Sequence, residues 1–98
     1  MSDTPIPRSA WSEVLTAFMA FFAALGEVGV EDGTVSFEAP ETGLSVSSDG
    51  TSESFMPLHG LSLTWDTIAF DAHRWEVRLV GPGGTYTYVV PPSLRPNS

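Results

Sequence analysis

Two histidines and two aspartates are the residues whose types and spacing could build a metal or acid–base site. They are His59 and His73, with Asp66 and Asp71 between them. If the backbone is extended there, the side chains of Asp71 and His73 lie on one side of a strand, where a carboxylate and an imidazole could bind Zn²⁺. Both histidines stand beside predicted turns, where solvent exposure is the simpler interpretation. The sequence therefore gives a candidate polar site at His59, Asp71 and His73, and we expect no cofactor or resident metal.

The remaining motifs are better explained by chain turns than by chemistry. No serine lies in a G-x-S-x-G motif. The run Gly81–Gly84 has the glycine content of a phosphate loop, but no helix is predicted after it and Pro82 lacks a donor N–H. Glu31 and Asp32 precede Gly33 and predict a break in the chain. Cysteine is absent, which excludes thiol catalysis and disulfides. We expect a protein that is not an enzyme.

The charge balance of the chain limits the classes of partner that it can bind. Twelve acidic residues face four arginines, no lysine is present, and the formal net charge is -8. A surface of this kind repels phosphate backbones, so nucleic-acid binding is not expected. The excess of acidic residues and the lack of lysine also resemble the composition of proteins from GC-rich or salt-loving organisms, and we state that source as a hypothesis. The lack of cysteine is consistent with a cytoplasmic location.

The segment Trp11–Leu25 is the one stretch with helical periodicity. At about 100° per residue, its large apolar side chains fall in one arc. The members of this arc are Trp11, Val14, Leu15, Phe18, Phe21, Phe22 and Leu25. The uninterrupted apolar part, residues 17–25, would be only about 13 Å long, against about 30 Å for the hydrocarbon core of a membrane. The sequence predicts a buried helix with no membrane span.

From residue 34 onward the apolar period changes from 3.6 to 2, which indicates β-strands. The predicted strands cover residues 34–39, 44–48, 51–56, 61–65, 68–70, 75–79 and 85–90. We expect turns at residues 27–33, 40–43, 49–50, 71–74 and 81–84. Asp49-Gly50 favours a two-residue hairpin loop, which would place Leu44 opposite Phe55 and Val46 opposite Glu53.

Short strands joined by tight turns must be antiparallel neighbours. The predicted fold class is α+β, with one N-terminal helix packed on an antiparallel β-meander of five to seven short strands. The helix should cover one face of that sheet. Residues 1–98 form a single domain by length, with residues 1–8 and 92–98 expected to be loose ends.

Two surfaces could support contact with a protein. Tyr86 and Tyr88 share one face of a predicted strand and belong either to the core or to an exposed aromatic patch. The small residues opposite the apolar arc of the helix could allow a homodimer, or they could simply favour helix formation. These residues are Thr16, Ala20, Ala23 and Ala24.

Our preferred hypothesis is a small acidic non-enzymatic domain that acts through protein–protein contact or self-association, as a regulatory or structural accessory protein. The alternative is a small-molecule- or metal-binding or hydrolytic domain, with a pocket between helix and sheet that uses His59, Asp71 or His73.

Overall fold

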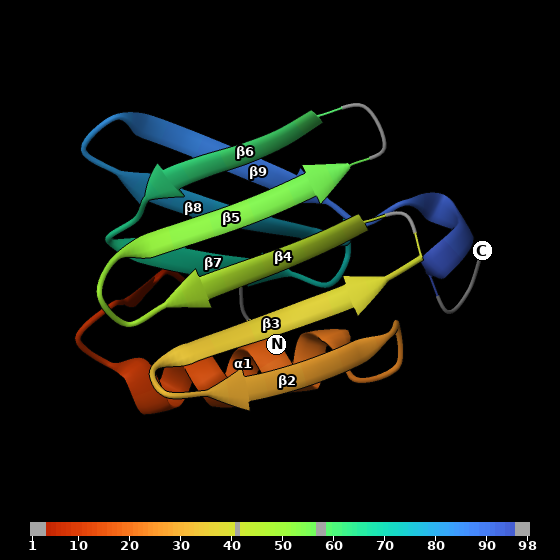
Figure 1. The fold of residues 1–98 in the computed structure, drawn as a ribbon, viewed down its shortest axis with the longest axis horizontal. Helices are drawn as coiled ribbons and strands as arrows, with labels where there is room; N and C mark the ends of the chain where they lie inside the picture. Colours follow the sequence, from red (N-terminus) through yellow and green to blue (C-terminus); the bar gives the residue numbers. More distant parts are fainter. Residues whose placement is uncertain (1–3, 41, 57–58, 96–98) are drawn as a thin grey trace.

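The computed structural model describes residues 4–40, 42–56 and 59–95, and gives the backbone alone for residues 54–56 and 59–63. Within these ranges it contains one α-helix, α1 (Trp11–Phe22), one short 3₁₀ helix, η1 (Pro92–Leu94), and nine β-strands (Figure 1). The strands are β1 (Ile6–Pro7), β2 (Glu27–Glu31), β3 (Thr34–Ala39), β4 (Thr42–Ser47), β5 (Thr51–Met56), β6 (His59–Thr64), β7 (Thr67–Asp71), β8 (Glu76–Gly81) and β9 (Gly84–Val89).

The strands form two antiparallel sheets. The four-stranded sheet has the order β1-β7-β8-β9, and the five-stranded sheet has the order β2-β3-β4-β5-β6. The chain changes sheets at Trp65 and Asp66. The N–H of Trp65 donates to the carbonyl of Gly50 in the five-stranded sheet, and that of Asp66 donates to Val80 in the four-stranded sheet. The predicted α+β class with antiparallel pairing is confirmed, whereas the single meander of five to seven strands is divided into two sheets whose apolar faces cover each other.

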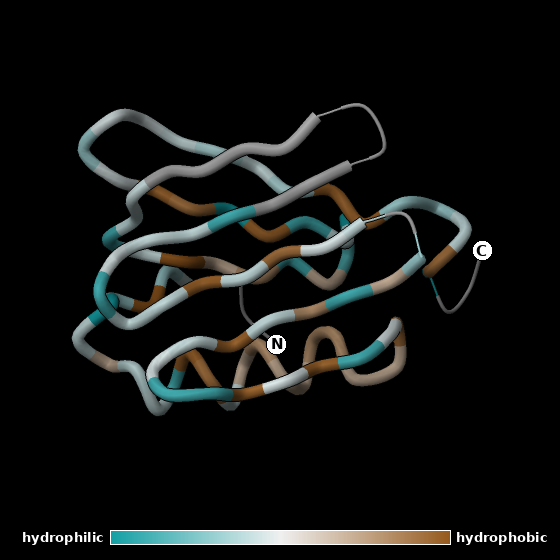
Figure 2. Tube along the Cα trace, in the orientation of Figure 1, coloured by the Kyte–Doolittle hydropathy of each residue, from teal (hydrophilic) through white to brown (hydrophobic). Residues whose placement is uncertain are grey.

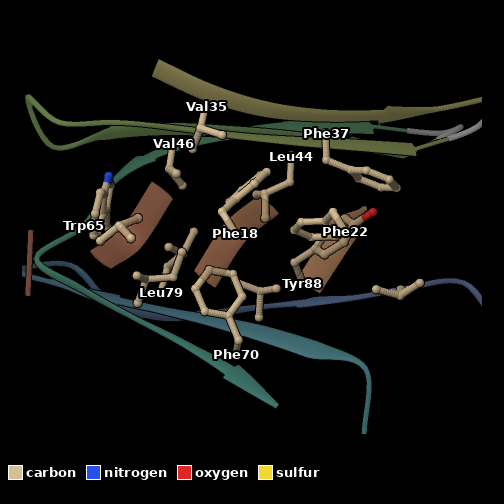
Figure 3. Packing of buried hydrophobic residues seen from close by; sticks show 14 of the residues in the cluster. Phe18, Phe22, Val35, Phe37, Leu44, Val46, Trp65, Phe70, Leu79 and Tyr88 are labelled. Atoms are coloured by element: carbon tan, nitrogen blue, oxygen red, sulfur yellow. The ribbon is translucent and has the colours of Figure 1, made fainter. Parts of the chain in front are cut away.

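The predicted helix is confirmed and ends three residues before Leu25. It contacts β1 and β7 of one sheet and β2 and β3 of the other. Its buried side chains are those of Val14, Phe18 and Phe22, and Phe18 and Phe22 point into the layer between the sheets (Figure 3). The helix therefore packs against the antiparallel strands as predicted, but it contacts both sheets where one sheet face was expected.

Aromatic side chains join the helix to both sheets. The ring of Phe22 stacks on Phe37 of β3 with centroids 4.3 Å apart, and Phe18 meets Phe70 of β7 edge-on at 6.2 Å. Such pairs add about 0.5–1.5 kcal/mol each beyond the burial of their area. Along β3 and β4, hydrophobic positions alternate with hydrophilic ones (Figure 2), as expected of strands with one face on a core. The core is thus a three-way contact between α1 and two sheets.

Strand β2 lies where the sequence predicted a turn. It pairs along its whole length with β3, from Glu27 opposite Glu38 to Glu31 opposite Thr34. The expected break is confined to Asp32 and Gly33, where Gly33 has a φ of 78°. The sequence pattern of β2 did not predict a strand because only two valines alternate there, with a glycine between them and glutamates at both ends.

The hairpin between β4 and β5 has a register one residue away from the predicted one. Leu44 pairs with Ser54 and Val46 with Ser52, so the loop contains three residues. A type I′ turn needs a positive φ at both central positions, but of the two only Gly50 has one, at 102°. Asp49 instead accepts hydrogen bonds at Oδ1 from the N–H and hydroxyl of Thr51. The three-residue loop with a left-handed glycine is the alternative that Asp-Gly also favours.

Both chain ends contain ordered parts where loose segments were expected. Ile6 and Pro7 pair with Ile68 and Thr67 as β1. After β9, η1 places Leu94 against the core, and Arg95 donates from Nε to the carbonyl of Val90 over 3.0 Å. The described segments near both ends of the chain therefore lie against the sheets.

Candidate functional site

The structure places Asp71 and His73 in the loop between β7 and β8, where the carboxylate has a structural role. Oδ1 of Asp71 accepts the backbone N–H of His73 at 3.0 Å and that of Arg74 at 3.1 Å. Its Oδ2 lies 3.9 Å from Nε of Arg74. The side chain of His73 is exposed. Asp71 thus holds the turn closed through backbone groups, which is the common use of aspartate in a loop.

The other members of the predicted polar site are not brought to this loop. His59 begins β6 in the five-stranded sheet and pairs with Met56, and its side chain lies outside the described residues. Asp66 lies at the corner between the sheets, with Oδ1 3.5 Å from Nη2 of Arg8. In the part of the chain that the structure describes, no group of three His, Asp or Glu side chains could hold a metal.

The two tyrosines of the candidate interface have different environments. Tyr88 is completely buried, and its hydroxyl shares a 2.7 Å hydrogen bond with the hydroxyl of Thr42 in the opposite sheet. Burial raises the pKa of Tyr88 above its ordinary value of 10.0, against the opposing effect of the Thr42 hydrogen bond. Tyr86 is half-buried beside Thr64 and the β8–β9 turn. Of the two alternatives for Tyr88, the structure shows the core one, because its side chain is completely buried.

The small face of the helix is exposed, as the periodicity predicted. Its four candidate residues Thr16, Ala20, Ala23 and Ala24 all face solvent, and Met19 beside them is 40% exposed. Elsewhere, among the side chains that the structure describes, the large exposed hydrophobic residues are Val30, Val80 and Val89. Val80 and Val89 lie four positions apart along the β8–β9 ladder, since they pair with Thr85 and Glu76. Within this described part of the surface, exposed apolar residues are thus scattered.

Strand β9 offers a different kind of contact surface, made of backbone groups. It is the last strand of the four-stranded sheet and has β8 on one side. Gly81 and Gly84 flank the hairpin turn as a pair, and hydrogen-bonded pairs alternate with non-bonded pairs from there. The N–H and C=O groups of Thr85, Thr87 and Val89 consequently point away from β8. No charged residue or proline occurs in Gly84–Val89.

The five-stranded sheet has β2 and β6 at its edges, and β2, the edge beside the helix, is arranged differently from β9 (Figure 1). The same alternation, counted from the Glu31–Thr34 pair, leaves the backbone groups of Val28 and Val30 pointing outward. Glutamates stand at both ends of this strand, which is visible as hydrophilic ends in Figure 2. Charges at an exposed edge are a common device against strand pairing. Strand β2 thus carries charges at its ends, whereas β9 carries none.

A groove lies between the N-terminal segment and the helix. It has a volume of 510 Å³ and is lined by Thr4, Pro5, Ile6, Pro7, Glu13, Ala17, Ala20, Phe21, Phe70 and Ala72. Asp71 and His73 flank Ala72 but are not among the lining residues. Most of the described lining is apolar, and Glu13 is the one charged side chain among these residues. The groove could not be foreseen from sequence because three separate segments form it.

Comparison with known protein families, with curated proteins and with solved structures finds no match for this chain. In the described part of the chain, no helix is both long enough and apolar enough to cross a lipid bilayer. The geometry of this chain is therefore the basis for what we propose about its function.

Proposed function

We propose that the protein acts by contact, as a non-enzymatic domain that self-associates through the free edge of β9. The observation that carries this proposal is the set of outward backbone groups on Thr85, Thr87 and Val89, in a strand with no charge and no proline. An unprotected edge of this kind is a template for another strand. The partner we infer is a second copy of the same chain.

A second copy fits because the edge is complementary to itself. Antiparallel pairing about a twofold axis at Thr87 brings Thr85 opposite Val89 of the second copy. This register uses all three outward residues and forms about six backbone hydrogen bonds. The nearest charges on the outer face of β8 are Glu76 and Arg78, which pair with each other at 3.7 Å. Two chains of net charge -8 can therefore approach here without adding like charges to the contact.

Pairing of two copies through the β2 edge would be less favourable. Pairing that uses both Val28 and Val30 would place Glu27 of one copy opposite Glu31 of the other, at both ends of the contact. Like charges directly opposite in a ladder are destabilising. This difference favours β9 over β2 as the site of association.

The expected dimer is weak and reversible. Each backbone hydrogen bond contributes about 0.5–1.5 kcal/mol net, and association costs about 4–15 kcal/mol in lost freedom. Cross-strand side-chain pairs add about 0.2–1 kcal/mol each. We expect a dissociation constant on the order of 100 µM, suited to a contact that forms when the protein is concentrated.

Sedimentation equilibrium tests the proposal with two lysine substitutions. Thr87→Lys places two ammonium groups opposite each other at the twofold axis and should abolish the dimer. It also reduces the net negative charge, so general repulsion cannot account for the loss. Thr16→Lys is the matched control, because Thr16 is exposed on the small face of the helix. A strictly monomeric native chain would overturn the proposal, and so would a dimer that Thr16→Lys removes and Thr87→Lys leaves intact.

A further inference from the structure

The groove beside the helix has the size and chemistry of a ligand site that is separate from the β9 edge. We propose that it binds a small amphiphilic cation, a molecule with an apolar body and a protonated amine. The groove volume of 510 Å³ lies within the range of about 300–1,000 Å³ that is usual for small-molecule pockets. This proposal is independent of the self-association proposed above.

The apolar body of the ligand is accommodated by the aromatic side of the groove. Phe21 of α1 and Phe70 of β7 line it with ring centroids 5.4 Å apart. Pro5, Ile6 and Pro7 of the N-terminal segment also line it. The pairing of Ile6 with Ile68 fixes this segment against the sheet. The groove is therefore held by elements of regular structure, which limits the cost of ordering it around a ligand.

The negative charge of Glu13 favours a ligand that carries a protonated amine. Among the described lining residues Glu13 is the one that carries a charge, and within the described part of the chain it takes part in no ion pair. The chain offers few cations to neutralise it, since it has four arginines and no lysine. Three of these arginines lie beside Asp66, Asp71 and Glu76, and Arg95 donates to Val90. A carboxylate that has no ion-pair partner among the described residues, at the rim of an apolar groove, is complementary to a ligand that supplies the positive charge.

Small side chains on the helix keep the groove open. Ala17 and Ala20 both line it, and Ala20 is exposed. A large side chain at Ala20 would occupy the space without disturbing the buried residues of the helix. Ala23 is also exposed but lies outside the lining, so a large side chain there should leave the groove unchanged.

Isothermal titration with phenylbutylamine, phenylbutanol and phenylbutyrate tests the proposal near neutral pH, because the three probes differ mainly in charge. The amine should bind about threefold more tightly than the alcohol, the usual scale for a solvent-accessible ion pair, and the carboxylate most weakly. Glu13→Gln should remove the preference for the amine and retain binding of the alcohol. Glu53→Gln, another exposed glutamate, is the control for overall charge.

Ala20→Phe should abolish binding of all three probes, whereas Ala23→Phe should not change it. Circular dichroism of each variant shows whether the fold is retained. Equal affinity for the three probes overturns the proposal, as does no measurable binding of the amine or amine binding that survives Ala20→Phe in a folded protein. None of these results depends on whether β9 forms a dimer, because Thr87→Lys can be titrated with the same probes.

Discussion

The hydroxyl of Tyr88 in β9 lies 2.7 Å from the hydroxyl of Thr42 in β4, and this buried hydrogen bond joins the two sheets. Both residues are almost inaccessible to solvent. The phenol therefore belongs to the core through its ring and satisfies its polar end inside the protein, as buried tyrosines usually do. In Figure 3 the Tyr88 side chain lies beside that of Phe22, between the sheets.

Removal of either hydroxyl should destabilise the fold. Tyr88→Phe should reduce the free energy of unfolding by about 1 kcal/mol, and Thr42→Val by about 1–3 kcal/mol because the phenol then lacks its partner. The double variant should cost less than the sum of the two, with a coupling of about 1 kcal/mol. Urea unfolding measures all three, and Thr64→Val at an exposed position is the control, expected within about 0.5 kcal/mol of the native chain. Strict additivity would show that the two hydroxyls do not interact.

The free energy of unfolding should also depend on the ionisation of Tyr88 at alkaline pH. Burial is the main cause that raises the pKa of Tyr88 above 10.0 in the folded protein. A raised folded pKa contributes stability that is complete below the unfolded value and is lost as the pH rises through the folded value. The advantage of the native chain over Tyr88→Phe should therefore stay constant up to about pH 10 and shrink above it. An advantage that persists unchanged well above that pH would contradict burial of an un-ionised phenol.

Gly81 should not tolerate a side chain, because the chain passes close to the corner between the sheets. A Cβ at this position would overlap the backbone carbonyl of Thr64, and a backbone atom cannot rotate away. Gly81→Ala should cost about 1–3 kcal/mol of unfolding free energy. At Gly83 a Cβ would meet nothing within 4 Å, so Gly83→Ala should be neutral or stabilising by up to about 1 kcal/mol. Thermal unfolding compares the two, and equal effects would indicate that the β8 end lies farther from β6.

Added salt should strengthen the dimer. Two chains of net charge -8 repel each other at a distance, and raising the salt from 0.1 M to 1 M shortens the screening length from about 10 Å to about 3 Å. Backbone hydrogen bonds between β9 strands are little affected by that change. The dissociation constant from sedimentation should therefore fall as sodium chloride increases. A dissociation constant that rises with salt would point to a contact held by ion pairs instead.

Sequence patterns predicted the elements whose apolar spacing is regular. The arc of Trp11–Leu25 predicted α1, and the alternation of Val35 with Phe37 predicted β3, because each pattern directly reflects one buried face. Strand β1 was missed since it contains two residues, one of them a proline. The division into two sheets depends on the corner at Asp66, where long-range hydrogen bonds to Gly50 and Val80 decide the path of the chain.

The candidate surfaces were less accessible to sequence analysis than the core. Exposure of the small helix face followed from its periodicity, but the groove needs Pro5, Phe21 and Phe70 to meet from three elements. The free edge of β9 likewise depends on which strand ends the sheet, and alternation along Thr85–Val90 does not reveal strand order. The pair Asp71 and His73 had spacing compatible with a site, yet the carboxylate is occupied by the backbone of its own loop.

Amide exchange measured by NMR at two protein concentrations tests the self-association through β9 most directly. Concentrations of about 50 µM and about 1 mM bracket the expected dissociation constant. The amides of Thr85, Thr87 and Val89 should exchange more slowly in the concentrated sample, while those of Val28 and Val30 at the β2 edge should exchange at the same rate in both. Unchanged exchange along β9, or slowing confined to β2, would contradict the account.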